Sequence, residues 1–299
     1  MFAVRRHPWF CQCRLTPALQ TLLLACLLLP ASATAEEIPA SARPLQGWTV
    51  PGTTALTDGN RLFLTFSQPP AADTTLRLPR LVSVVRFIRW LEGSTAEMSV
   101  QPEPREWRVR VSGVPDLPKP VLVLTLDSPP RFFNALTPVA ATADAVFLRA
   151  CEAEVHGKNL RYEPQPQKNT VGYWSVAEDY AEWHCEVPAS GSYDVDILQG
   201  CGAGQGGSRV EVSLQNQKLP LTVIETGHFQ NFIWKPLGQA TLQKTADMVL
   251  TVRCLKKQAG AVMDVRAVRI TPVGKSRSLQ PELAAPDLLP PSLRSPTDK

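Results

Sequence analysis

The sequence lacks the short motifs that mark the common hydrolases. Its 299 residues contain no H-E-x-x-H, no G-x-S-x-G and no Cys and His paired at a recognisable spacing. Metalloprotease, serine-hydrolase and cysteine-protease mechanisms therefore have no motif in their support. Catalysis stays open only as an alternative, because paired carboxylates can always be found among the 27 acidic residues.

The chain also has little net charge. It carries 31 basic and 27 acidic residues, and three of the arginines (Arg5, Arg6 and Arg14) lie in an N-terminal segment that we expect to be removed. The remaining 28 basic residues nearly balance the 27 acidic ones. Nucleic-acid binding needs clustered charge that neutralises phosphates, so no nucleic-acid partner is expected.

Residues 1–35 have the pattern of an export signal. Arginines precede the apolar run LTPALQTLLLACLLLP, and the small residues ASATA offer a cleavage site before Glu36. The mature protein is therefore expected to be secreted or periplasmic. The stretch LLAC gives an alternative, a lipoprotein anchored through Cys26. No later segment approaches the ~20 consecutive apolar residues of a membrane span, so no transmembrane span is expected.

Short apolar strands without a helical period predict an all-β protein with two β-sandwich domains. The first, residues 47–128, contains RLFLTF, VSVVRFIRWL, EWRVRV and PVLVLTL, and EWRVRV alternates with Trp107 inward and Arg108 outward. A linker rich in Ala, Pro and Thr separates it from the second, residues 146–273. Residues 274–299 are rich in Pro and Ser without periodicity, and we expect them to be disordered.

The segment GCGAGQGGSRVEV contains G-x-G-x-x-G at Gly202, Gly204 and Gly207. A dinucleotide-binding loop needs a helix after these glycines, because the helix N-terminus holds the pyrophosphate. The following SRVEVSL instead alternates as a strand does. We therefore interpret the glycines as a turn between two strands that pair antiparallel.

Two stretches resemble families found in glycan-degrading enzymes. The order RLFLTF, VVRFIRWLEG, WRVRVSGVPD resembles the C-terminal β-sandwich of α-L-fucosidases. The segments CEAEVHGKNLRYE, VGYW, DYAEWHCEVPASGSYDVDI and ETGHFQNF resemble carbohydrate-binding modules of the family 6 and 35 type. The second resemblance implies a jelly roll that binds a glycan. A fucosidase barrel of ~250 residues that alternates strands with helices has no counterpart in this chain.

The resemblance also implies a ligand site in the loops around VGYW, QGCGAGQGGS and ETGHFQNF. Sugars bind to an aromatic face through the C–H side of the ring, with a few directed hydrogen bonds. Burial of the aromatics in the core, or a turn-capping role for the polar groups, is the alternative for each residue. The candidate ligand-binding residues are Tyr173, Trp174, Gln205, Gly206, His228, Gln230 and Asn231.

Modules of this type commonly hold a structural calcium ion, and the matching residues here are Glu152, Glu154 and Asp264. Export favours disulfides over a thiolate or zinc site, which would also need a ligand spacing that is absent. Cys185 and Cys254 alternate inward in strands that pair in the jelly-roll order, so we predict a bridge between them. The pairing of Cys151 and Cys201 stays open.

Three function classes follow from the sequence. The leading hypothesis is a secreted, non-catalytic glycan-binding protein. The first alternative is an architectural or protein-interaction module that partners a secreted fucosidase or sulfatase, and the second is an enzyme related to glycoside hydrolases.

Overall fold

The computed structural model describes residues 36–71, 75–92, 96–142, 145–165 and 167–275. The predicted export signal with Cys26, and the predicted tail beyond Lys275, lie outside the described residues. Strands make up the regular structure of the described part, apart from one 3-10 turn, η1 (Ala150–Glu152). This confirms the all-β prediction. No helix in the described ranges is long and apolar enough to cross a membrane.

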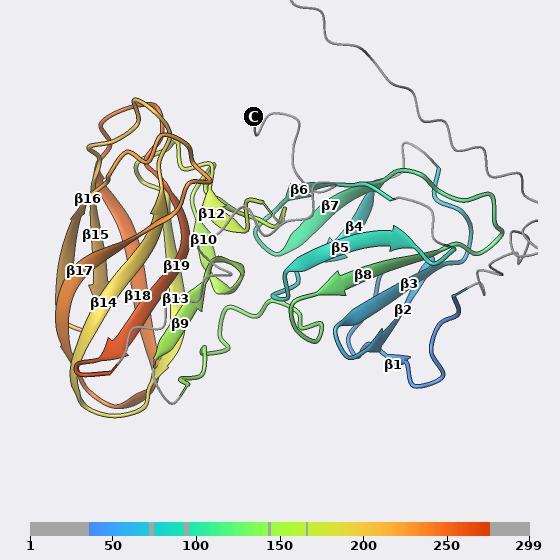
Figure 1. Ribbon diagram of the computed structural model, residues 1–299, viewed down its shortest axis with the longest axis horizontal. Coiled ribbons are helices and arrows are strands. Elements are labelled where there is room, and N and C mark those ends of the chain that lie inside the picture. Colours follow the sequence, from blue (N-terminus) through green and yellow to red (C-terminus); the bar gives the residue numbers. More distant parts are fainter. Residues whose placement is uncertain (1–35, 72–74, 93–95, 143–144, 166, 276–299) are drawn as a thin grey trace, which may run out of the picture. The chain divides into compact units, whose positions relative to one another are not determined.

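The first sandwich consists of two antiparallel sheets (Figure 1). Its inward side chains belong to one hydrophobic cluster that includes Trp90 and Trp107, both fully buried. In β7 Trp107 is buried and Arg110 is exposed, which confirms the predicted alternation. The sheets are β1 (Arg43–Pro44), β2 (Thr53–Asp58), β3 (Arg61–Phe66), β8 (Val121–Leu126) and β5 (Val85–Trp90), and β4 (Leu76–Pro79), β7 (Glu106–Val111) and β6 (Met98–Pro102).

The second sandwich follows with two further antiparallel sheets. One has the order β10 (Glu154–His156), β13 (Tyr180–Val187), β18 (Thr245–Lys256), β15 (Arg209–Leu214), β16 (Gln217–Thr222). The other has the order β11 (Arg161–Glu163), β12 (Thr170–Gly172), β19 (Asp264–Pro272), β14 (Gly191–Gly200), β17 (Ile233–Leu242), and β9 (Val146–Arg149) also pairs with β19.

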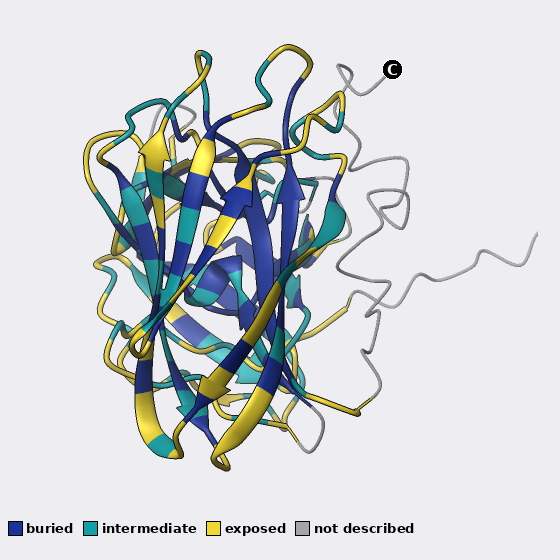
Figure 2. Ribbon diagram, turned by 90° about the vertical axis from the view of Figure 1, so that its left-hand side faces the viewer, coloured by how far each residue is buried: buried dark blue, intermediate teal, exposed yellow. Residues whose placement is uncertain are grey.

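Alternation of burial along the strands explains why the second sandwich forms. In β13 every second residue is buried, including Trp183 and Cys185, while the residues between them are partly exposed. Figure 2 shows such bands along several strands. Strand β19 differs because nearly all of it is buried, so both of its faces are covered. Its Asp264 end therefore lies deep at one end of the sandwich.

The glycine-rich segment connects the two sheets of this sandwich. Residues 209–214 form a strand, as predicted, which excludes the helix that a dinucleotide loop requires. The predicted pairing of the flanking strands is wrong, because β14 belongs to one sheet and β15 pairs with β16 and β18 in the other. The intervening residues span this crossing, and Gly204 and Gly207 adopt positive φ within it.

Candidate functional site

Four loops meet at the end of the second sandwich where β14 ends and β19 begins. They are residues 173–179, 201–208, 223–232 and 257–263, and together they are called the loop end below. Gly202 and Gly227 form a parallel bridge, and Ala203 N donates to Gly227 O at 3.2 Å. Thr226 N donates to the carbonyl of Cys201 at 2.9 Å. The second and third loops are therefore joined through their backbones.

Glycine permits this close approach of the two loops. A Cβ built on Gly200 would lie 2.0 Å from the carbonyl oxygen of Phe229, and one on Gly202 would lie 2.7 Å from the Phe229 ring. Any side chain at either position would displace the third loop. The glycines thus serve packing between loops as well as the turn.

The fourth loop was not predicted as part of the site. Val262 N donates to the carbonyl of Trp174 at 2.8 Å, and Ala261 N donates to Gln205 Oε1 at 2.8 Å. Lys257 Nζ donates to the carbonyl of Ser175. This loop thereby connects the first loop to the second, and the segment KKQAGAVM carries no aromatic or glycine-rich pattern that could have identified it.

The two adjacent aromatic candidates have different environments. Tyr173 is 56% exposed, whereas Trp174 is 1% exposed and its Nε1 is buried without a hydrogen-bond partner. One ring therefore faces the core and the other faces solvent. Trp174, predicted as a binding platform, is thus a core residue in this structure.

Tyr173 has two unusual features. Its φ is +61°, in the left-handed region that bulky side chains rarely adopt. The guanidinium carbon of Arg161 lies 3.6 Å from the centre of its ring, a cation–π contact. Arg161 reaches it because it is paired with Gly172, the residue before Tyr173, across β11 and β12.

The polar candidates hold the shape of the third loop. His228 is exposed, and its Nδ1 accepts a hydrogen bond from Gln230 N at 3.2 Å, so it caps a turn. Asn231 Nδ2 donates to the carbonyl of Thr226 at 2.7 Å. Gln205 accepts a hydrogen bond from the fourth loop through its Oε1. A Cβ built on Gly206 would lie 3.1 Å from Glu225.

Two buried carboxyl groups lie beside Gly172, the residue before Tyr173. A Cβ built on Gly172 would lie 2.8 Å from both Asp264 Oδ1 and Glu163 Oε2. Burial raises the pKa of Asp264 well above its usual value and the charge of Glu163 raises it further, while Lys168 acts in the opposite direction. A hydrogen bond joins Gln230 to Asp264, which connects the third loop to these carboxyls.

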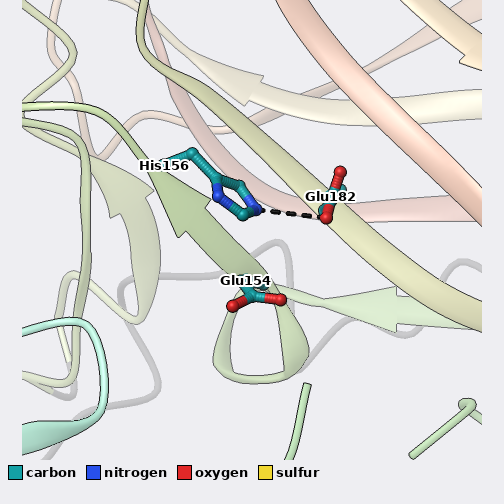
Figure 3. Close-up of side chains that lie close together, drawn as sticks. All are labelled: Glu154, His156 and Glu182. Atoms are coloured by element: carbon teal, nitrogen blue, oxygen red, sulfur yellow. Dashed lines mark ion pairs between the residues drawn. The ribbon is translucent and has the colours of Figure 1, made fainter. Parts of the chain in front are cut away.

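The three predicted calcium ligands occupy different surroundings. Glu152 is bound by arginines, with Arg149 at 3.1 Å and Arg131 at 3.3 Å. Asp264 lies beside Gly172, as described above. Glu154 instead belongs to a group with His156 and Glu182, in which one ligand atom of each lies within 4.8 Å of the others (Figure 3). Calcium binding by Glu152, Glu154 and Asp264 stays a prediction.

The predicted Cys185–Cys254 bridge does not form in the structure. The four described cysteines are free thiols, namely Cys151, Cys185, Cys201 and Cys254. Cys185 lies opposite Met248 in the β13–β18 ladder, and Cys254 is six residues farther along β18. At about 3.3 Å per residue the two are ~20 Å apart, far beyond disulfide reach. Burial raises the pKa of the Cys185 thiol to about 12.

No family model and no curated protein matches the chain. Among solved structures, the chain is similar to a native family 35 carbohydrate-binding module from Clostridium thermocellum, with 16% identity, 44% of this chain and 99% of that chain covered, and a TM-score of 0.34. It is also similar to the C-terminal family 6 module of the laminarinase LamC from Zobellia galactanivorans, with 17% identity, 42% and 98% covered, and a TM-score of 0.35.

A third similar structure is an α-L-fucosidase from Vibrio sp. strain EJY3, with 12% identity, 73% of this chain and 39% of that chain covered, and a TM-score of 0.32. All three similarities lie below 25% identity and below a TM-score of 0.5. They therefore carry no argument about function, and the residues of the loop end must supply it.

Proposed function

We propose that the chain is an exported, non-catalytic protein that binds a neutral or weakly acidic glycan at the loop end of its second sandwich. The observation that carries this proposal is Tyr173, an exposed aromatic ring held at φ +61° where loops far apart in the sequence meet. The export part depends on the sequence pattern of residues 1–35 alone.

Backbone strain at Tyr173 favours a functional role. A non-glycine residue in the left-handed region costs about 1 kcal/mol or more, and such residues cluster at binding sites. Glycine at this position would remove the strain, although the contact of the ring with Arg161 would be lost. We therefore infer that the tyrosine ring itself is what the strained position serves.

The surroundings of Tyr173 suit a sugar. A tyrosine ring offers an apolar face to the C–H side of a pyranose, and Arg161 on the ring supplies donors for hydroxyl or carboxylate oxygens. His228 and Asn231 lie on the exposed third loop, which Gln230 connects to Asp264 beside Gly172. The predicted residues Gln205 and Gly206 act through loop shape in this proposal.

The binding should be weak, because an open aromatic platform buries little area and its polar partners must give up water. A Kd of ~10 μM to 1 mM corresponds to about 4 to 7 kcal/mol. Titration calorimetry of the purified full chain against fucosylated, galactosylated and sulfated oligosaccharides tests the proposal. Tyr173→Ala should reduce affinity at least ~tenfold, whereas Phe87→Ala, at an exposed aromatic of the first sandwich, should not.

The same titration separates the alternatives. Absence of binding below about 10 mM, together with capture of a secreted fucosidase or sulfatase, would replace glycan binding by the interaction-module function. Release of a chromogenic group from fucoside or sulfate substrates would instead establish an enzyme. A steep loss of affinity with salt would identify a sulfated ligand.

A further inference from the structure

A second group of side chains lies on β10 and β13 and includes none of the residues assigned to glycan binding. Glu154 and Glu182 are directly opposite each other in the antiparallel ladder, and His156 follows two residues after Glu154 on the same face. One ligand atom from each lies within 4.8 Å of the others. Figure 3 shows the His156 ring directed at Glu182, with the Glu154 carboxylate nearby.

The two opposed carboxylates repel each other unless a positive charge lies close by. Like charges directly opposite each other in a ladder destabilise a sheet unless a cation lies close by. Arg105 contacts Glu154 at 3.1 Å, but its side chain is 77% exposed, so this ion pair is weak and easily displaced. Glu154 and Glu182 thus have separate partners, Arg105 and His156, whereas one bound cation would serve both carboxylates at once.

His156 places its Nε2 against Glu182 in an ion pair that lacks hydrogen-bond geometry. Its Nε2 lies 3.1 Å from Glu182 Oε1. The nitrogen is nevertheless covered from solvent, and its geometry makes no hydrogen bond. A buried polar atom without a hydrogen bond is costly. A metal ion between the carboxylates would supply a partner for the imidazole lone pair.

Packing holds the imidazole in place. The His156 ring stacks on Tyr180, with centroids 4.4 Å apart and planes inclined by 11°. The guanidinium carbon of Arg253 lies 3.4 Å from the centre of the Tyr180 ring. The histidine is therefore oriented by stacking before any ion arrives, which reduces the ordering that binding requires.

We propose that Glu154, His156 and Glu182 bind a divalent transition-metal ion of the Zn²⁺ class. Ca²⁺ and Mg²⁺ prefer oxygen ligands, whereas one imidazole with carboxylates suits Zn²⁺ and its neighbours. Bonds of about 2.1 Å place tetrahedral donors ~3.4 Å apart, so ligand atoms that lie within 4.8 Å of one another need to close by at most about 1.4 Å. Three protein ligands leave one position for water.

The expected consequence is a fastened edge strand. β10 has three residues, and within the described ranges its strand partner is β13 alone; two of the three residues are the proposed ligands. An ion bound to Glu154, His156 and Glu182 would join this strand to its neighbour independently of the three ladder pairs. Because binding requires the folded arrangement, the ion should stabilise the protein by mass action.

Titration of the chelator-treated full chain with ZnCl₂ tests this site. We expect one strong site per chain by calorimetry, a rise in Tm with Zn²⁺, and no such rise at this site with Mg²⁺. His156→Ala and Glu182→Gln should each lower zinc affinity at least ~tenfold and abolish the rise in Tm. Circular dichroism should show that the variants remain folded.

His184→Ala is the matched control. His184 lies on the same strand and face as Glu182 and contacts Asp247 at 2.8 Å, but it has one carboxylate neighbour in place of two. It should bind zinc within about twofold of the wild type. Loss of zinc binding in His184→Ala, or unchanged binding in both site variants, would overturn the proposal.

Arg105→Gln gives a test that cannot be confused with unfolding. Removal of a competing cation should tighten zinc binding several-fold, and a weaker affinity would contradict the proposed site.

Cobalt substitution identifies the donors. Bands of a nitrogen and oxygen ligand set are expected, whereas a thiolate charge-transfer band would assign the ion to cysteine and refute the site.

Discussion

Asp264 and Glu163 come within reach of each other across Gly172, where a single Cβ would lie 2.8 Å from an oxygen of each carboxyl. Both side chains are buried, and Asp264 is only 4% exposed. The absence of a side chain at residue 172 is therefore what allows two acidic groups to share the space beside Gly172.

Gly172→Ala should destabilise the second sandwich. The added methyl group would overlap two buried oxygens that have little freedom to move, and overpacking of this kind costs ~1 to 3 kcal/mol. Chemical denaturation measures the loss. Gly260→Ala is the control, because its Cβ would meet only the flexible Gln205 side chain at 3.3 Å. An equal effect of both substitutions would contradict the proposed crowding.

Asp264→Asn should change how stability depends on pH. The pKa of Asp264 is raised by burial and by Glu163, so the folded state holds this proton more tightly than the unfolded chain. The contribution of this proton to the free energy of unfolding is fully present below the unfolded pKa of about 3.9, and it is lost as pH rises through the folded pKa. The variant should therefore gain stability relative to wild type between about pH 4 and neutrality.

Denaturation curves at several pH values check this dependence. Asp58→Asn provides a contrast of opposite sign, since hydrogen bonds from Arg61 and Ser41 lower the pKa of Asp58. That variant should lose stability relative to wild type as pH rises. Parallel pH profiles for wild type and Asp264→Asn would show that the Asp264 proton is not linked to folding.

Tyr173→Asn should separate binding from stability. Asparagine tolerates positive φ, so relief of backbone strain should offset the loss of the contact with Arg161, and the free energy of unfolding should change by less than ~1 kcal/mol. Glycan affinity should nevertheless fall at least ~tenfold. A variant with wild-type affinity would remove Tyr173 from the proposed site, and a much less stable one would assign it a structural role.

The cysteines should be recovered as thiols. Under native conditions an alkylating reagent should modify Cys254 first, because it is partly exposed while the other three are buried. Burial raises the pKa of Cys151 to about 12 and that of Cys201 to about 11, so little reactive thiolate is present at neutral pH. Peptide mapping without reductant checks this, and a peptide joining Cys185 to Cys254 would contradict the strand register.

The sequence predicted the strands better than their partners. Alternation correctly identified β7 and β15, because burial of every second residue is a local property. The sheet that β15 joins and the distance between Cys185 and Cys254 depend on register between distant segments, which local pattern does not encode. The direction of Cys185 was right and its partner was wrong.

The candidate site shows the same division. An aromatic pair in a turn indicated a candidate loop, but the sequence could not reveal that Trp174 faces the core and Tyr173 faces solvent. The roles of Gly172 and Asp264 likewise come from a contact between residues far apart in the chain. The fourth loop, residues 257–263, carried no signal because its backbone rather than its side chains makes two of the connections.

The backbone connections between residues 201–203 and 226–227 have a kinetic consequence for a ligand at the loop end. Loops already joined to each other need no slow rearrangement before an encounter becomes productive, so association should proceed at ~10⁶ M⁻¹s⁻¹. With a Kd of ~100 μM, dissociation would occur at ~100 s⁻¹, a residence time of about 10 ms. Such a protein would sample a polymeric surface through many brief visits rather than remain attached at one place.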